Sequence, residues 1–198
     1  MDYMEIIKLK AMELMKNCPG SHDWFHVIRV RDLALKLGRE LNADLEVLEA
    51  AAYLHDIARC DSPENHEIKS AILAEKILSE AGFPEQKVKH VLSCIRKHRF
   101  RVYEEKSTIE EKILYDADKL DSIGAIGVAR AFMYAGEMGY KLYGESDKEH
   151  SAFHEFKYKL CKVINTLNTE PARKIGFQRT TFMEKFFERL AREVKGEY

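Results

Sequence analysis

Histidine and aspartate residues that could hold a metal ion occur at three places in the chain. His26 lies in SHDWFHVIRV, the pair His55 and Asp56 in YLHDIA, and Asp118 in YDADKLDSIG. The pair closes an apolar run, EAAAYL, that must face the core, and an unpaired buried carboxylate is costly. A divalent cation would compensate for that cost. Imidazole together with carboxylate suits Mn, Fe, Co, Ni, Zn or Mg better than a thiolate-seeking ion.

Each of these places has a plainer interpretation when it is taken alone. A single histidine on a helix is more often a satisfied core or surface residue, and DADKLD could be a solvated turn or a helix N-terminus. His22 and Asp23 spell a second His-Asp pair, but they stand where helix-capping residues belong, so neither is expected to be a ligand. The joint order of histidine, His-Asp and aspartate, each on a predicted helix, favours a metal site.

The spacing of apolar residues predicts the helices that carry these side chains. Asp44 is expected to cap the helix LEVLEAAAYLHDIA, which is apolar enough to be central and buried. Between residues 22 and 41, apolar side chains recur every three or four positions and predict one buried stripe, formed by Val27, Val30, Ala34, Leu37 and Leu41.

Two further helices are expected between residues 66 and 98. The first carries Ile68, Ile72, Glu75 and Leu78 on one side and ends at Gly82. Pro84 is expected as the first residue of the second. After a polar stretch at 99–108, helical patterning resumes through DADKLD.

The sequence of the last third of the chain predicts a loop and two long helices. The segment 136–150 is broken by glycines and is expected to be a mobile loop. Apolar repeats predict helices over 153–167 and 182–194. No strand-like alternation, internal repeat or linker is visible. We therefore predict an all-α, single-domain helical bundle over 1–198, with the motif core at about 21–135 and the C-terminal helices of 148–195 packed on it.

Composition limits the class of partner. Lys plus Arg (32) nearly equals Asp plus Glu (33), so no global field favours nucleic acid or a membrane surface. The N-terminus is amphipathic and has no long apolar run that would span a membrane. The cysteines show no CxxC spacing and are expected to be reduced thiols in a cytoplasmic protein; they are Cys18, Cys60, Cys94 and Cys161.

The motif order resembles that of the HD superfamily of metal-dependent phosphohydrolases. HDWFHVIRV resembles the family's first motif, which makes His26 the ligand there. YLHDIAR resembles the motif that names the family, with ligands His55 and Asp56. YDADKLDSIGAIGVARAF resembles the last motif, with ligand Asp118. Other stretches, such as HEIKSAILAEKIL and IRKHRF, are similar to a subgroup of small, single-domain bacterial and archaeal HD hydrolases.

The resemblance implies a bundle of the HD-domain type and a metal-dependent phosphohydrolase that acts through metal-activated water. A nucleotide or another small phosphate ester is the expected substrate, and one or two divalent ions the expected cofactor. Asp56, Asp118 and Arg59 are the expected catalytic residues, with Asp118 or a neighbouring carboxylate steering the water. The further carboxylates considered for such a role are Asp61, Glu64 and Asp121.

Other residues near the motifs have roles that the sequence leaves open. His66 and His98 stand where HD proteins with two metals carry extra histidines, and they either bind a second ion bridged through Asp56 or orient other groups. Arg59 follows the His-Asp pair by one helical turn and could contact phosphate with a forked geometry. Lys69 is a further candidate for phosphate binding.

Arg99 and Arg101 are also basic residues near the histidines, although a salt-bridged surface role is the plainer interpretation for either one. Two alternative functions remain at this point. One is an HD-type di-iron oxygenase, and the other is a nucleotide-sensing HD module without turnover. The exposed parts of the C-terminal helices could form a homodimer surface, or their aromatic residues could fill the core.

Overall fold

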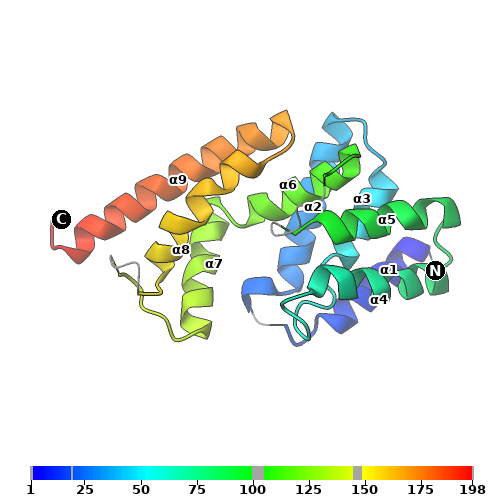
Figure 1. The fold of residues 1–198 in the computed structure, drawn as a ribbon, viewed down its shortest axis with the longest axis horizontal. Helices are drawn as coiled ribbons and strands as arrows, with labels where there is room; N and C mark the ends of the chain where they lie inside the picture. Colours follow the sequence, from blue (N-terminus) through cyan, green and yellow to red (C-terminus); the bar gives the residue numbers. More distant parts are fainter. Residues whose placement is uncertain (1, 19, 100–104, 145–148, 198) are drawn as a thin grey trace. The chain divides into compact units, whose positions relative to one another are not determined.

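A computed structural model describes residues 2–18, 20–99, 105–144 and 149–197. Within these ranges the regular structure is helical, apart from one isolated bridge between Lys141 and Ser151. Figure 1 shows the helices, which form two compact units, Met1–Asp118 and Lys119–Tyr198. None of the helices in the described ranges is long and apolar enough to cross a membrane. The predicted all-α fold is confirmed.

The first unit is organised around one buried helix, α3 (Leu45–Leu54), which contacts α1, α2, α4 and α5. Its residues from Ala50 to Leu54 are all buried, as expected for so apolar a segment. The surrounding elements are α1 (Tyr3–Leu14), the 3-10 turn η1 (Gly20–His22), α2 (Trp24–Glu40), α4 (His66–Ala81), α5 (Glu85–Lys97) and α6 (Ile109–Asp121), of which residues up to Asp118 belong to this unit.

Side-chain hydrogen bonds cap the N-termini of α2, α3 and α6. The Asp23 carboxylate accepts a hydrogen bond of 3.0 Å from the backbone N–H of His26, and the Asp44 carboxylate accepts from two N–H groups of α3. Both predicted caps are confirmed. At the start of α6, Thr108 Oγ1 accepts from the N–H of Glu111, while the Glu111 carboxylate accepts from the N–H of Thr108, which is a capping box.

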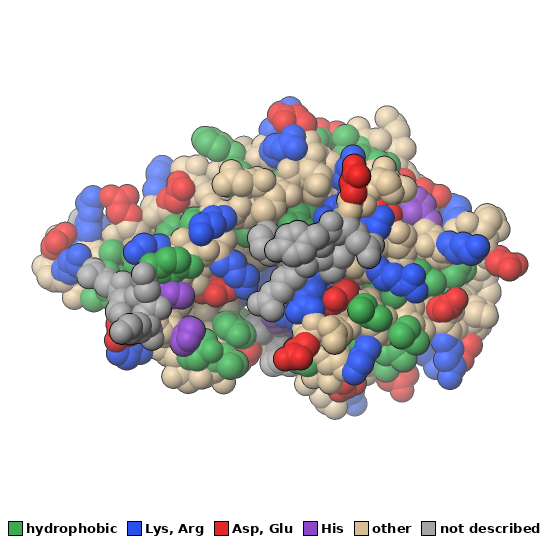
Figure 2. All heavy atoms as spheres, viewed as in Figure 1, with side chains coloured by type: hydrophobic (Ala, Val, Ile, Leu, Met, Phe, Trp, Pro, Cys, Tyr) green, Lys and Arg blue, Asp and Glu red, His purple; other side chains and the backbone are tan. Residues whose placement is uncertain are grey.

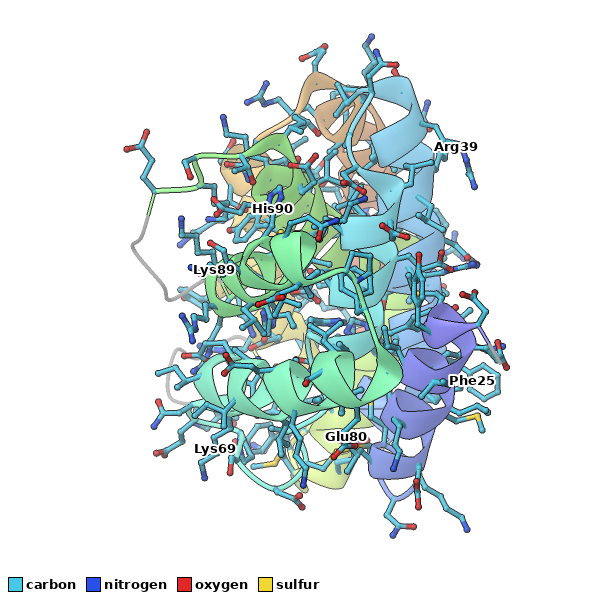
Figure 3. The ribbon with its side chains drawn as sticks, turned by 90° about the vertical axis from the view of Figure 1, so that its right-hand side faces the viewer. Phe25, Arg39, Lys69, Glu80, Lys89 and His90 are labelled. Carbon is cyan, nitrogen blue, oxygen red and sulfur yellow. A yellow bond between two sulfur atoms is a disulfide. The ribbon has the colours of Figure 1, made fainter. Side chains whose placement is uncertain are left out.

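Helices α4 and α5 form an antiparallel hairpin and lie side by side in Figures 1 and 3. Gly82 ends α4 with a φ of 72°, as predicted. Pro84 is the N-cap of α5 and not its first helical residue, because its ψ of 116° is extended. Ile68 and Ile72 are exposed, whereas Leu78, placed on the same side by the sequence, is buried. The hydrophobic residues that α4 buries are Ala71, Ala74, Ile77 and Leu78, of which the alanines allow close helix packing.

The second unit contains α7 (Gly124–Glu137), α8 (Ala152–Tyr158), the 3-10 helix η2 (Leu160–Thr166) and α9 (Glu170–Val194). Phe187 of α9 is fully buried and stacks on Phe132 and Phe156, with ring centroids 6.0 Å and 4.3 Å away. The predicted helix 182–194 is therefore part of α9. The proposed packing of 148–195 on the motif core stays a prediction.

Two expectations for this region need correction. The predicted helix 153–167 is broken at Lys159, where φ is −128° and ψ is −58°, into α8 and η2. The β-branched residues Val163, Ile164 and Thr166 have low helix propensity. The local sequence therefore favours a continuous helix only weakly. The predicted loop 136–150 begins later, because α7 continues to Glu137. Residues 145–148 of that segment lie outside the described ranges.

The expectation of four reduced thiols is wrong for one pair. Cys18 and Cys60 form a disulfide with a Cα–Cα distance of 5.6 Å, whereas Cys94 and Cys161 are free. The bond joins the connection between α1 and α2 to the segment after α3. The two cysteines are 42 residues apart in sequence, and only the packing of these segments brings them together. The argument from reduced thiols to a cytoplasmic location therefore loses its support.

Candidate metal centre

Six histidine and aspartate side chains from five helical regions converge within the first unit. One comes from the first turn of α2, two from the turn after α3, and one each from the start of α4, the end of α5 and the last turns of α6. They are His26, His55, Asp56, His66, His98 and Asp118. Asp118 has 14% of its side chain exposed, and the other five are buried.

The four ligands predicted from the HD motifs form one group. Nε2 of His26 lies 3.4 Å from Nε2 of His55 and 3.5 Å from Oδ1 of Asp118. Oδ2 of Asp56 lies 3.7 Å from the first of these nitrogens and 3.8 Å from the second. Ligand atoms of His26, His55 and Asp118 are all within 4.8 Å of one another, so one ion could bind them together.

His66 and His98 form a second group on the other oxygen of Asp56. Oδ1 lies 3.2 Å from Nε2 of His66 and 3.4 Å from Nε2 of His98, and these two nitrogens are 3.3 Å apart. The carboxylate of Asp56 therefore has one oxygen facing each pair of histidines. A carboxylate placed in this way could be shared by two ions.

Three of the histidines are held in the same way. Nδ1 lies at hydrogen-bonding distance from the carbonyl oxygen three residues earlier, at 2.8 Å for His55, 3.2 Å for His66 and 2.6 Å for His98. A carbonyl oxygen only accepts, so Nδ1 donates and carries the proton in each ring. The lone pair is then on Nε2, the atom that faces Asp56. Such a backbone contact fixes both the tautomer and the orientation of a metal-binding histidine.

These donor atoms fit a divalent cation. Burial lowers the pKa of His55 from its ordinary 6.5 to about 4, so this imidazole is neutral near pH 7. Oδ1 of Asp56 is buried and has no hydrogen-bond partner among the described residues. Several lone pairs converge without a proton between them, and a cation would relieve this.

Arg59 lies beside the second pair of histidines. Its Nη1 is 3.1 Å from Nδ1 and 3.3 Å from Nε2 of His66, so it lies over the ring and not on one lone pair. Its Nη2 is 3.4 Å from Nε2 of His22. The sequence predicts a helix-start role for His22. The structure adds a contact with Arg59 that the sequence did not indicate.

The other basic candidates have different surroundings. Lys69 is exposed, points away from the ribbon in Figure 3, and donates to Ser62 Oγ at 2.6 Å. Arg99 donates to the carboxylate of Glu67 at 3.0 Å, which confirms a salt-bridged role, although the side chain is only 17% exposed. Arg101 lies outside the described residues.

The additional carboxylates considered as catalytic groups are not equivalent. Asp61 and Glu64 are exposed. Asp121 is buried and pairs with Arg130 at 2.8 Å. Sequence reasoning missed Glu67, a buried carboxylate next to His66. The signal available for it was a charged residue in the first turn of a helix that begins at a candidate ligand.

Comparisons with known proteins identify the family. The HD domain family model matches residues 24–123, which include all six converging residues. YpgQ from Bacillus subtilis, described as uncharacterized, is 34% identical over 196 residues, covering 97% of this chain and 94% of YpgQ. The crystal structure of YpgQ in complex with ADP matches with a TM-score of 0.80, covering 98% of this chain and 100% of that one.

Two other solved structures are similar. A Lactobacillus plantarum protein matches with 26% identity and a TM-score of 0.84, covering 98% of this chain and 97% of that one. An HD-superfamily hydrolase from Bacillus thuringiensis matches with 30% identity and a TM-score of 0.79, covering 97% and 96%. The match extends over nearly the whole of each chain and is not confined to the motifs. The chain therefore belongs to the HD domain family, as a small HD-superfamily hydrolase similar to YpgQ.

Proposed function

We propose that this protein is a metal-dependent phosphohydrolase that acts on a nucleotide or another small phosphate ester. The observation that carries the proposal is the position of Asp56, with one carboxylate oxygen facing each of two pairs of histidines. The complex of YpgQ with ADP supports a nucleotide as the ligand class.

The first ion would be held by the four residues of the HD motifs, and a second by His66 and His98 with Asp56 as the shared ligand. The lone pairs that converge on Oδ1 favour this role for the two histidines over a purely orienting one. A bound divalent ion lowers the pKa of water and neutralises charge on a phosphate. Mn, Fe, Co, Ni, Mg and Zn all accept such imidazole and carboxylate donors.

The remaining groups bind and orient the substrate. Arg59 is half-buried beside His66 and has a planar guanidinium that can donate two hydrogen bonds to phosphate oxygens. Asp118, the most exposed of the six converging residues, lies where a substrate can reach the centre, and its carboxylate would orient the attacking water. Lys69 could contact a more distant phosphate only by leaving Ser62.

A small-molecule substrate also agrees with the surface. On the face drawn in Figure 2, acidic and basic side chains are intermingled, and no broad basic area of the kind that binds nucleic acid is visible among the described residues.

Phe177 and Phe182 of α9 are 66% and 48% exposed and would be the centre of the proposed homodimer surface. Size-exclusion chromatography with light scattering of the wild type and F177S/F182S tests that assembly.

The function is tested with protein that has been stripped by a chelator and reloaded separately with Mn, Mg, Co, Ni or Zn. Each form is incubated with nucleoside mono-, di- and triphosphates and with simple phosphate esters, and products are identified by phosphorus NMR. Release of phosphate or pyrophosphate in a metal-dependent manner supports the proposal. The identity of the product separates removal of one terminal phosphate from release of pyrophosphate.

Asp56→Asn is the matched inactive control, because it keeps the shape of the side chain and removes the charge shared by the two groups. Turnover that persists at the wild-type rate in this variant would refute the assignment. Oxygen consumption with iron, together with no hydrolysis under Mg or Zn, would indicate the di-iron oxygenase. Tight binding of ADP without turnover under any metal would indicate a sensor.

A further inference from the structure

The pair Arg99 and Glu67 joins the two elements that carry His66 and His98. Glu67 follows His66 at the start of α4, and Arg99 follows His98 just beyond the end of α5. Nη1 of Arg99 donates to Oε2 of Glu67 at 3.0 Å. The ion pair therefore connects the residue after one proposed ligand to the residue after the other.

The ion pair lies at the open end of the helical hairpin, where it can control the spacing of α4 and α5. The turn at 82–84 holds one end of α4 and α5 together, and His66 and His98 are at the opposite end. Figure 3 shows the two helices side by side along their length. At the end away from the turn, no chain connection keeps the helices at a fixed spacing, so side-chain contacts must do so.

Arg99 also binds the chain just before α4. It donates to the backbone carbonyl of Glu64, and its Nη2 lies 3.4 Å from the carbonyl oxygen of Pro63. Nδ1 of His66 donates to this same Pro63 carbonyl. Arg99 thus holds the backbone group that orients His66, while its own backbone adjoins His98.

Burial makes these contacts energetically important. The side chain of Glu67 is 8% exposed and that of Arg99 is 17% exposed. Removing one member leaves the other charge without its partner in a poorly hydrated place, which is more disruptive than breaking an exposed pair. The planar guanidinium can bind a carboxylate and two carbonyls at once, which a lysine ammonium on a flexible stem does less well.

We infer that Arg99 and Glu67 are positioning residues that set the spacing of His66 and His98 and thereby the affinity for the second metal ion. The inference rests on the proposed second ion position. Neither residue is one of the six converging side chains, so both would act through His66 and His98. The four residues of the first position are fixed by other elements, so its affinity is independent of the pair.

The test measures metal binding and does not rely on turnover. Chelator-stripped protein is titrated with Mn²⁺ by calorimetry, and electron paramagnetic resonance reports whether two bound ions are magnetically coupled. Wild type is expected to bind two ions per chain and to show the coupled signal. In Arg99→Met, affinity for the second ion is expected to fall by more than about 10-fold and the coupled signal to disappear. Affinity for the first ion should change by less than about two-fold.

Three further variants make the test specific. Glu67→Gln removes the carboxylate charge but leaves the hydrogen bonds from Arg99 to its two carbonyl oxygens. The loss of affinity for the second ion should therefore be smaller than in Arg99→Met. Arg99→Lys keeps the positive charge but lacks the planar guanidinium. Its affinity for the second ion is expected to lie between those of wild type and Arg99→Met. Arg96→Gln alters a neighbouring exposed arginine of α5 and should match wild type. If Arg99→Met fails to fold by circular dichroism, Glu67→Gln and Arg99→Lys decide the question.

The outcomes separate the two proposals. Two ions bound with unchanged affinity in Arg99→Met, or in the milder variants where it does not fold, would overturn the role of the pair and leave the second ion position intact. A wild type that binds one ion would overturn the second position and, with it, the inference. Hydrolysis in that protein would leave the phosphohydrolase assignment standing.

Discussion

Nε2 of His26 and Nε2 of His55 lie 3.4 Å apart, although the two residues are 29 positions apart and belong to different helical regions. Two imidazole nitrogens at this distance repel if both carry lone pairs, and both bind if a cation or a proton lies between them. Nδ1 of His55 is committed to the Ala52 carbonyl, which leaves its Nε2 free to bind. The relationship is the one that a shared metal ion requires.

Replacing Asp56 should remove metal and hydrolysis together. Asp56→Ala takes away the carboxylate that faces both pairs of histidines, so metal affinity should fall by more than about 100-fold, beyond the cost of losing a residue that only orients a ligand. Metal content by elemental analysis and turnover are measured on the same sample. Metal retained at the wild-type level would contradict the assigned centre.

Two controls accompany this variant. Asp61→Ala removes an exposed aspartate five positions later and should leave both measurements unchanged. His22→Ala should keep its metal, because His22 contacts Arg59 and is not expected to bind the ion. Loss of that contact should raise KM by less than about 10-fold.

Replacing Arg59 should weaken substrate binding without removing metal. Arg59→Met deletes charge-assisted hydrogen bonds to phosphate, each of which contributes about 1.5–3 kcal/mol, so KM should rise by about 10- to 100-fold. Arg59→Lys should recover part of the loss. Steady-state kinetics and metal analysis check both variants.

Arg39 provides the control for Arg59. It is exposed at the end of α2 and points away from the ribbon in Figure 3, so Arg39→Met should have wild-type kinetics. An Arg59→Met enzyme with unchanged KM would show that Arg59 does not bind phosphate. Its contacts with His66 would then have only a structural role.

The disulfide should contribute substantially to stability. Joining residues 42 positions apart restricts the unfolded chain and is expected to add about 4 kcal/mol to the free energy of unfolding. Cys18→Ser/Cys60→Ser should lose roughly this amount in chemical denaturation, whereas Cys161→Ser should not. Thiol titration of denatured, unreduced protein should find two thiols, rising to four after reduction. Four thiols before reduction would contradict the bond.

Glu111 should make the stability of the folded protein depend on pH. Burial by itself would raise its pKa, but hydrogen bonds from Ser93, Lys97 and the N–H groups of Ser107 and Thr108 lower the pKa below its ordinary value of 4.5. The folded form therefore releases this proton more readily than the unfolded form does. The stabilisation is present above pH 4.5 and is lost as the pH falls through the lowered value.

The test compares wild type with Glu111→Gln by denaturation between pH 3 and 7 in the presence of a chelator. The variant should be less stable by about 1–3 kcal/mol above pH 5, and the difference should shrink as the pH falls below 4.5. Glu105→Gln, at an exposed side chain, is the control. A constant difference at every pH would mean that the charge of Glu111 does not matter.

Local sequence determined much of the scaffold. Caps at Asp23 and Asp44 and the stop at Gly82 depend on neighbouring residues only, and all three are confirmed. Where local preference is weak, as around Lys159, packing determined the outcome and the predicted long helix was wrong. Ile68 and Ile72 show the same limit, because periodicity defines the faces of a helix and the neighbours determine which face is buried.

The motifs identified the four expected ligands by their residue type and order, but not how their atoms face one another. Only the tertiary structure places the two oxygens of Asp56 toward different pairs of histidines, joins Cys18 to Cys60, and sets Arg99 against Glu67. These relationships join separate segments of the chain, up to 42 positions apart for Cys18 and Cys60, and no local pattern encodes such contacts. They arise because helices pack their buried faces together, and that packing fixes which distant side chains meet.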